Sequence, residues 1–189
     1  MKAEYLKIPG MILITLKKHG DHRGFFMETY RESLFAELGI HEKFIQDNRS
    51  FSLKNVIRGM HYQIKNPEGK LVSVLRGRIF DVGVDLRKHS KTFGQWCGVE
   101  LSAEKPQHLF LPPGVAHGFC TLEEENEMYY KCTGYYDPSN EGGLFWRDPM
   151  VDIQWPIDNP VINERDNQFP MLSDISTNRM PQVSLQQNA

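Results

Sequence analysis

The sequence predicts an all-β fold, a sandwich or barrel with short peripheral helical structure. Three observations support this prediction. Apolar residues gather in many short runs at fairly regular spacing, turn-forming residues separate the runs, and only one segment has helical periodicity. The 15 glycines and 11 prolines are scattered along the chain rather than concentrated in a linker. We therefore expect a single domain, which we place at residues 1–172.

The predicted strands follow one another through most of the chain. They cover residues 11–16, 24–30, 43–48, 70–75, 79–86, 95–101, 107–111, 117–122 and 127–133. Within 79–86, large apolar residues alternate with Asp81, Gly83 and Asp85, a period of two that is typical of a half-buried strand. Turn signals lie between the runs, at residues 66–69, 76–77, 112–114 and 137–140.

One segment has the pattern of a helix. In residues 31–38, Leu34, Phe35 and Leu38 lie on one stripe, and Gly39 provides a stop. We expect this helix to be peripheral because it is short. The end of the chain, residues 173–189, is polar with little periodicity, so we expect a loosely attached tail.

Composition and charge disfavour several classes of protein. The 189 residues carry 22 Lys and Arg against 24 Asp and Glu, a formal net charge of −2, whereas a nucleic-acid binder has a basic excess. Cys97, Cys120 and Cys132 form no CxxC pair, which favours reduced thiols. The longest apolar run near the N-terminus, residues 11–16, is too short for a signal core or a membrane span. We expect a cytoplasmic protein with no membrane attachment.

The first candidate site is the run from Arg58 to Gln63. On a regular strand, Gly59, His61 and Gln63 would point to one face and Arg58 to the other. A glycine beside a histidine leaves room for a ligand to approach the imidazole. A structural histidine bonded to a carbonyl group is the alternative interpretation.

The second candidate is His117, which follows the Pro-Pro-Gly turn at residues 112–114. Metal-binding jelly rolls of the cupin type have a similar P-x-G-x-x-H element, together with an H-x-H pair on an earlier strand. Here the corresponding stretch begins at His61 but has Gln63 in place of the second histidine. Glutamine is a poor ligand for the metals that histidine sites prefer, so we expect no metal.

Four tyrosines lie between residues 129 and 136. On a strand, Met128, Tyr130 and Cys132 share a face. The edge of an aromatic core accounts for some of these rings. A buried phenol can also donate a proton, and an exposed ring can stack on a base or sugar.

Taken together, these segments resemble the dTDP-4-dehydrorhamnose 3,5-epimerase family. The resemblance is carried, in order, by residues 20–28, 46–50, 56–63, 81–87, 92–96 and 113–119, and it extends from about residue 10 to about residue 170. It implies a double-stranded β-helix (a cupin-type jelly roll), a homodimer, and no metal or organic cofactor. The implied reaction converts dTDP-4-dehydro-6-deoxy-D-glucose to dTDP-4-dehydro-L-rhamnose, on the way to dTDP-L-rhamnose.

The resemblance also implies roles for particular residues. His61 would be the general base, Asp166 its orienting partner, Tyr130 the acid on the other face of the sugar, and Lys70 the cation that stabilises the enolate oxygen. The implied substrate-binding residues are Arg23, Glu28, Gln46, Asp47, Asn48, Arg58, His117, Tyr135, Glu141 and Arg165. Of these, some nucleotide-binding residues would reach across the dimer interface, and Tyr135 would stack on the thymine. Arg165 departs from the lysine that relatives often carry.

Three alternatives remain open at this point. A relative that inverts only C3 or only C5 would use the same histidine and tyrosine. A jelly-roll lectin could hold a nucleotide sugar without turnover, although it would not need His61, Asp166 and Tyr130 together. A metal-dependent cupin oxygenase or isomerase is disfavoured by Gln63.

Overall fold

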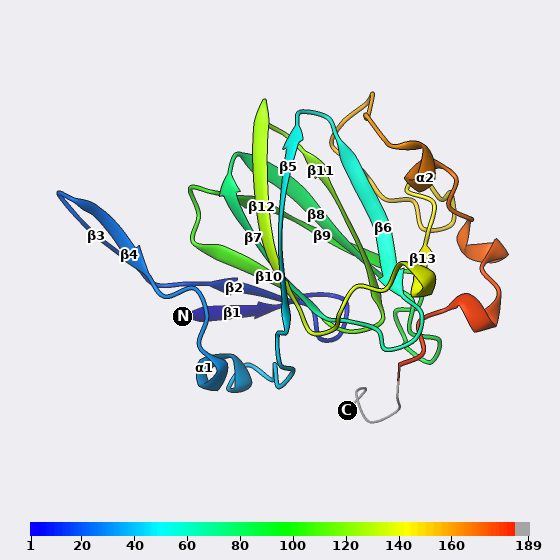
Figure 1. The fold of residues 1–189 in the computed structure, drawn as a ribbon, viewed down its shortest axis with the longest axis horizontal. Coiled ribbons are helices and arrows are strands. Elements are labelled where there is room, and N and C mark those ends of the chain that lie inside the picture. Colours follow the sequence, from blue (N-terminus) through cyan, green and yellow to red (C-terminus); the bar gives the residue numbers. More distant parts are fainter. Residues whose placement is uncertain (184–189) are drawn as a thin grey trace.

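The computed structural model describes residues 1–183, and these residues form two facing antiparallel sheets (Figure 1). The larger sheet has the order β1-β2-β10-β7-β12-β5 and the smaller β13-β6-β11-β8-β9. The strands are β1 Lys2–Tyr5, β2 Ile12–Thr15, β3 Lys18–Asp21, β4 Gly24–Met27, β5 Gln46–Leu53, β6 Ile57–Gln63, β7 Lys70–Arg76, β8 Arg78–Asp85, β9 Trp96–Ser102, β10 Gln107–Leu111, β11 Val115–Thr121, β12 Glu125–Cys132 and β13 Glu141–Gly143. The prediction of an all-β jelly roll is confirmed.

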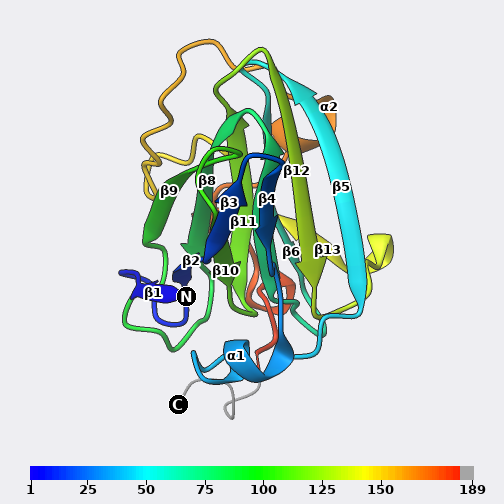
Figure 2. The ribbon, with the colours of Figure 1, turned by 90° about the vertical axis from the view of Figure 1, so that its left-hand side faces the viewer.

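The core lies between the two sheets because each sheet turns apolar side chains toward the other. One buried cluster joins Val72 and Leu109 of the larger sheet to Ile79, Leu101 and Phe119 of the smaller one. A second cluster, which contains Met60, Val82 and Leu144, fills the side of the smaller sheet that the C-terminal segments cover. The smaller sheet is therefore buried on both faces, and Figure 2 shows the two sheets from the side.

This double burial corrects the expectation of a half-buried strand at residues 79–86. Asp81 and Asp85 of β8 have no exposed surface, although their positions in the alternation indicated a solvent face. Each carboxylate has partners that offset the cost of burial. Asp85 accepts hydrogen bonds from Arg87 Nε and Nη2 at 2.9 Å and from the hydroxyls of Ser90 and Thr92 at 2.6 Å.

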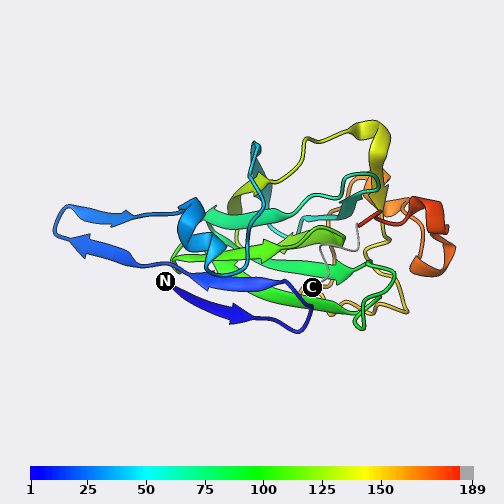
Figure 3. The same cartoon turned by 90° about the horizontal axis from the view of Figure 1, so that it is seen from below.

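The hairpin of β3 and β4 projects from the body, and Figure 3 shows it at the opposite end of the long axis from the C-terminal segments. Almost all of its residues are exposed, including Phe25 and Phe26. Helix α1 (Glu32–Ala36) follows it, buries Phe35, and is shorter than the predicted 31–38. Gly39, with a φ of +85°, ends the helical segment as expected.

The C-terminal segments pack against the smaller sheet. They contain α2 (Glu164–Asn167) and the short 3-10 turns Leu172–Asp174 and Thr177–Arg179. A third 3-10 turn, Pro138–Asn140, precedes β13. Ile175 is buried in the second cluster, and the Gln182 amide donates to the Ile64 carbonyl at 2.7 Å. Residues 173–183 are thus attached to the body rather than loosely held, and the rest of the predicted tail, 184–189, lies outside the described residues. Within residues 1–183 no helix is long and apolar enough to span a membrane.

We predict that Asp85→Ala lowers the free energy of unfolding by about 3–5 kcal/mol, because it leaves the buried Arg87 without its counterion. Urea denaturation followed by tryptophan fluorescence measures the change. Glu124→Ala, at the exposed ion pair with Lys54, is the control and should change the same free energy by less than about 1 kcal/mol. Equal effects of the two substitutions would contradict this account of Asp85.

Candidate active site

A cavity of about 320 Å³ opens between the two sheets. Residues of the larger sheet that line it are Gln46, Asn48 and Ser50 of β5, Lys70 of β7, and Met128, Tyr130 and Cys132 of β12. The smaller sheet contributes Arg58, His61, Tyr62 and Gln63 of β6, His117 and Phe119 of β11, and Glu141 of β13, while Glu68 and Tyr136 come from connecting segments and Arg165 from α2. The sequence thus brings together residues from positions 46 to 165 around one space.

A β-bulge decides which side chains of β6 face the cavity. In the pairing of β6 with β11, His61 lies opposite His117 and Arg58 lies opposite Phe119, so two residues of β6 face the single Gly118. The expected alternation therefore fails, and Arg58 shares the cavity with His61. Gly59 makes this possible, because its φ is +129° and a Cβ there would lie 2.5 Å from the Gly118 Cα.

His61 is held by Asp166. The His61 Nε2 atom lies 2.9 Å from Asp166 Oδ1, and the Gly59 amide donates to Asp166 Oδ2 at 3.0 Å. Asn163 caps α2 by accepting from the Asp166 amide at 2.7 Å, which fixes the start of this helix behind β6. Arg165 Nη2 also lies 3.2 Å from Nε2, but the shorter contact is to the carboxylate, which only accepts hydrogen bonds, so we assign the proton of the neutral ring to Nε2 and the lone pair to Nδ1.

Asp166 is fully buried, yet it is ionised. Burial alone would raise its pKa, but the hydrogen bonds from His61 and the Gly59 amide and the charge of Arg165 outweigh burial and lower the pKa to about 2. The carboxylate therefore stays negative beside the imidazole at neutral pH, an arrangement that can stabilise an imidazolium.

Arg165 connects this dyad to the rim of the cavity. Its Nε donates to Asp166 Oδ1 at 3.2 Å, and its Nη1 donates to Glu141 Oε2 at 2.8 Å. The Tyr136 hydroxyl donates to the same Glu141 oxygen at 3.3 Å. A lysine has one ammonium group in place of this fork, so arginine can hold the two carboxylates at once.

The larger sheet presents Tyr130 and Lys70 to the same cavity. These residues lie on the neighbouring strands β12 and β7. Burial raises the pKa of Tyr130 above its usual value, and the nearby Lys70 only partly opposes this, so the phenol keeps its proton at neutral pH. Burial would lower the pKa of Lys70, but Glu68, Cys132 and Tyr130 reverse this and raise the pKa. The wall opposite His61 therefore holds a neutral phenol and an ammonium ion.

Strand alternation divides the predicted nucleotide-binding run in β5. Gln46 and Asn48 face the cavity, joined by a hydrogen bond of 3.1 Å, and Ser50 follows them on the same face. Asp47 lies on the opposite face of the sheet, where it accepts from Lys131 at 2.7 Å and from the Tyr129 hydroxyl at 2.8 Å. The structure thus does not place Asp47 with Gln46 and Asn48, because successive side chains of a strand point to opposite faces.

Three other predicted residues lie away from the cavity of their own chain. Arg23, on the projecting hairpin, forms an ion pair with Asp21 at 2.6 Å, and Glu28 at its base pairs with Arg31 at 2.6 Å. Tyr135 is 73% exposed, next to the cavity-lining Tyr136.

Several residues that line the cavity or contact its histidines were not predicted from the sequence. Ser50 continues the i, i+2 series of Gln46 and Asn48, which was a usable signal. Asp81 is also new: both of its carboxylate oxygens lie 3.0 Å from Nε2 of His117, which forms a second, buried histidine–aspartate pair. Phe169 contacts the His61 ring edge-on, with 5.6 Å between ring centroids. Glu68 precedes Lys70 by two residues, and nothing in the sequence distinguished it from an ordinary acidic residue of an exposed turn.

The region around Gln63 does not gather metal ligands. Its side-chain oxygen accepts from Asn140 at 3.2 Å. Across the described part of the chain, no three His, Cys, Asp or Glu side chains come together as a ligand set.

Known proteins are similar to this chain in sequence and in fold. The family model described as dTDP-4-dehydrorhamnose 3,5-epimerase matches residues 5–174. The chain belongs to this family. A dTDP-4-dehydrorhamnose 3,5-epimerase of Salmonella typhimurium is 49% identical over 168 residues, which cover 87% of this chain and 92% of the relative. A dTDP-4-dehydrorhamnose 3-epimerase of Streptomyces niveus is 36% identical over 176 residues, 92% of this chain and 85% of the relative.

Solved structures agree. The crystal structure of dTDP-6-deoxy-D-glucose-3,5-epimerase from Legionella pneumophila, in complex with dTDP-4-keto-L-rhamnose, matches with a TM-score of 0.93 and 42% sequence identity, covering 97% of this chain and 98% of that one. The family and its fold establish the chain as a carbohydrate epimerase, an isomerase of dTDP-rhamnose biosynthesis.

The lowered pKa of Asp166 predicts a pH dependence of stability. With an ordinary value of 3.8 and a folded value of about 2, the carboxylate stabilises the protein above about pH 4, and this contribution is lost as the pH falls toward 2. The lost amount is about 2 kcal/mol. Urea unfolding at pH 5 and at pH 2.5 should show this loss in the wild type and a smaller loss in Asp166→Asn. The same loss in both proteins would contradict the assignment.

Proposed function

We propose that this chain inverts both C3 and C5 of dTDP-4-dehydro-6-deoxy-D-glucose by acid–base catalysis through an enolate. One observation carries the proposal. The His61–Asp166 pair lies on one wall of the cavity, and Tyr130 and Lys70 lie on the other. A base and an acid on opposite walls are what inversion of a carbon centre requires, because the proton leaves one face and returns on the other.

The C4 ketone of the substrate makes this chemistry accessible. It acidifies the protons on C3 and on C5, since removal of either gives an enolate with its charge on O4. His61 Nδ1 takes the proton, and Asp166 on the other ring nitrogen stabilises the imidazolium. Tyr130 delivers a proton from the opposite face. The ammonium of Lys70 stabilises O4 as the charge develops there.

The remaining residues bind the nucleotide sugar. His117 lies opposite the base in the pairing of β6 with β11, Arg58 lies three residues before the base on β6, and both line the cavity, where they suit the diphosphate and the sugar. Gln46 and Asn48 extend along β5 toward Tyr136, whose amide donates to Gln46 Oε1 at 3.0 Å, and we place the nucleoside along this path. Tyr135 then has an exposed ring on which thymine can stack.

A single-centre epimerase is the second candidate function. The relative from Streptomyces niveus is named a 3-epimerase, and an enzyme of that kind needs the same base and acid. The higher identity to relatives named 3,5-epimerases favours inversion at both centres.

We predict that the wild-type protein incorporates solvent deuterium at both C3 and C5 of the keto sugar, measured by NMR in heavy water. Label at one carbon only would support the single-centre reaction.

His61→Ala should lose turnover by more than about 100-fold, because the base is gone, and retain dTDP binding in calorimetry. Tyr130→Phe should still exchange deuterium but form little inverted product, because His61 can return a proton only to the face from which it came. Unchanged turnover in His61→Ala would contradict the assigned base.

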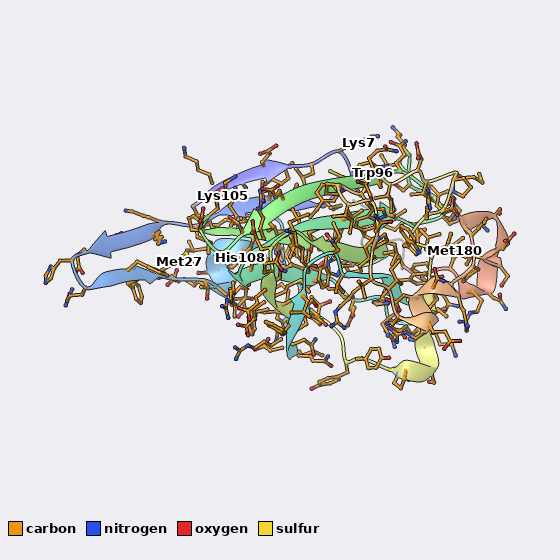
Figure 4. The ribbon with its side chains drawn as sticks, turned by 90° about the horizontal axis from the view of Figure 1, so that it is seen from above. Lys7, Met27, Trp96, Lys105, His108 and Met180 are labelled. Carbon is orange, nitrogen blue, oxygen red and sulfur yellow. The ribbon has the colours of Figure 1, made fainter. Side chains whose placement is uncertain are left out.

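We also propose that the active form is a homodimer in which the hairpin of one copy reaches the cavity of the other. Arg23 and Glu28 lie outside the cavity of their own chain, and Phe25 and Phe26 are 62% and 73% exposed. Figure 4 labels Met27, Lys105 and His108 near the point where the hairpin leaves the body.

The same region offers a surface for the second copy. A groove of about 340 Å³ runs over β7, β10 and β12 beside the hairpin and is lined by apolar and aromatic side chains, among them Phe25, Tyr30, Leu75 and Tyr129. Solvent-exposed apolar surface of this kind favours association. A two-fold axis would exchange the two hairpins, so each cavity would gain Arg23 and Glu28 of the other copy.

A complementation experiment tests the exchange. We predict that His61→Ala and Arg23→Ala, each poorly active alone, recover about a quarter of wild-type activity when they are unfolded together and refolded as a mixture. Half of the dimers are then mixed, and one of their two cavities combines an intact body with an intact hairpin. Light scattering should give the mass of two chains. No recovery by a mixture that does form dimers would show that each cavity uses its own hairpin.

A further inference from the structure

A buried ion pair lies on the cavity wall beside Tyr130. Glu68 Oε1 is 3.3 Å from Lys70 Nζ, and the two side chains are only 8% and 12% exposed. Both line the cavity. Glu68 has no role in the acid–base chemistry proposed above.

The surrounding backbone holds Glu68 in this position. Its neighbour Gly69 donates its amide to the Thr133 hydroxyl at 2.8 Å and accepts from the Thr133 amide at 3.0 Å, which fixes the turn against the end of β12. Gly134 leaves the space that the acid occupies, because a Cβ there would lie 3.3 Å from the Glu68 Cβ.

The pair is not an ordinary structural salt bridge. The second carboxylate oxygen, Oε2, is buried and has no hydrogen-bond partner among residues 1–183. A buried carboxylate with one free oxygen costs stability, so packing alone does not explain why an acid stands here. Its one ionic partner is the lysine that faces the reacting ketone in the proposed function.

Glu68 is the only carboxylate of the described chain that pairs with Lys70. The other groups that act on the ammonium are the Tyr130 phenol and the Cys132 thiol, both on β12, and burial raises the pKa of Cys132 to about 12. Arg58, across the cavity on β6, acts on Tyr130. At neutral pH the phenol and thiol are uncharged, so Glu68 supplies the negative charge next to the ammonium.

We propose that Glu68 is a positioning residue of the epimerase, whose carboxylate holds the Lys70 side chain on the cavity wall and keeps it in the ammonium form. The inference rests on the proposed function, in which Lys70 meets O4 of the substrate. An amine buried without a counterion loses its proton readily and then cannot stabilise an enolate oxygen by charge.

The experiment measures Lys70 directly. Protein labelled with 13C at the lysine Cε carbons is titrated by NMR, and the Lys70 signal is assigned by its absence in Lys70→Met. In Glu68→Gln, which keeps the shape of the side chain, we expect the titration midpoint of Lys70 to fall by about one pH unit or more. The alkaline limb of kcat should move in the same direction. Glu68→Asp keeps the charge on a shorter stem, so kcat should fall while the midpoint stays nearer to that of the wild type.

Glu141→Gln is the matched control. It removes a cavity-lining carboxylate that pairs with Arg165 and not with Lys70, so the Lys70 midpoint should not move. An unchanged midpoint in Glu68→Gln, or an equal shift in Glu141→Gln, would overturn the proposal. A fall in the midpoint that is specific to Glu68→Gln, in a protein that shows no epimerisation, would instead refute the proposed function and leave the effect of Glu68 on Lys70 standing.

Discussion

The buried carboxylate of Asp166 is the interaction on which the site depends. It joins an imidazole on β6, a backbone amide at the bulge of the same strand, and the guanidinium of Arg165. A carboxylate without exposed surface remains charged only where donors surround it, and these three supply that environment. Because Asp166 lies 105 residues after His61, the His61–Asp166 pair exists only once the C-terminal segment has packed onto the smaller sheet. Packing of that segment and formation of the pair are therefore coupled.

The bulge in β6 is the second requirement, and it follows from glycine. Gly59 and Gly118 allow β6 and β11 to approach where any side chain would collide. The extra residue turns Arg58 to the face that His61 occupies, so an imidazole and a guanidinium three residues apart on one strand share the cavity. The same bulge presents the Gly59 amide to Asp166. A single backbone irregularity thus supplies both the side-chain arrangement and a hydrogen bond that keeps the aspartate ionised.

Much of this could be predicted from the sequence, and the failures have physical causes. Most strands with apolar runs were predicted because burial requires such runs, whereas β1, β3 and β13 are short or exposed and carry no apolar pattern. The buried β6 was not among the predicted runs and was treated as a strand only as a candidate site, because polar and glycine residues interrupt its apolar positions. Alternation separated Asp47 from Gln46, but the resemblance grouped them as one motif. The prediction that Arg58 points away from the face of His61 was wrong, because a bulge arises from the pairing of two strands and one segment does not reveal it. Asp81 and Asp85 were expected at a solvent face, but the C-terminal segments cover the Val82 side of β8, and the two aspartates lie on the side that faces the larger sheet, where His117 and Arg87 are their partners. Glu68 depends on a contact with Lys70 that only the fold defines.

The cations that line the cavity differ in whether a carboxylate pairs with them. Lys70 is paired with Glu68, and Arg165 is paired with Glu141 and Asp166, so each has a fixed position before a ligand arrives. Arg58 differs, because its guanidinium donates only to the Ser52 hydroxyl at 3.0 Å and to the Phe51 carbonyl at 3.3 Å, and no carboxylate within residues 1–183 pairs with it. A cation with neutral partners retains its full attraction for an anion, whereas one that already contacts a carboxylate is partly neutralised. In the proposed reaction the diphosphate is therefore drawn to Arg58. The cation at the ketone is held in place by its counterion and contributes chiefly when negative charge develops on O4.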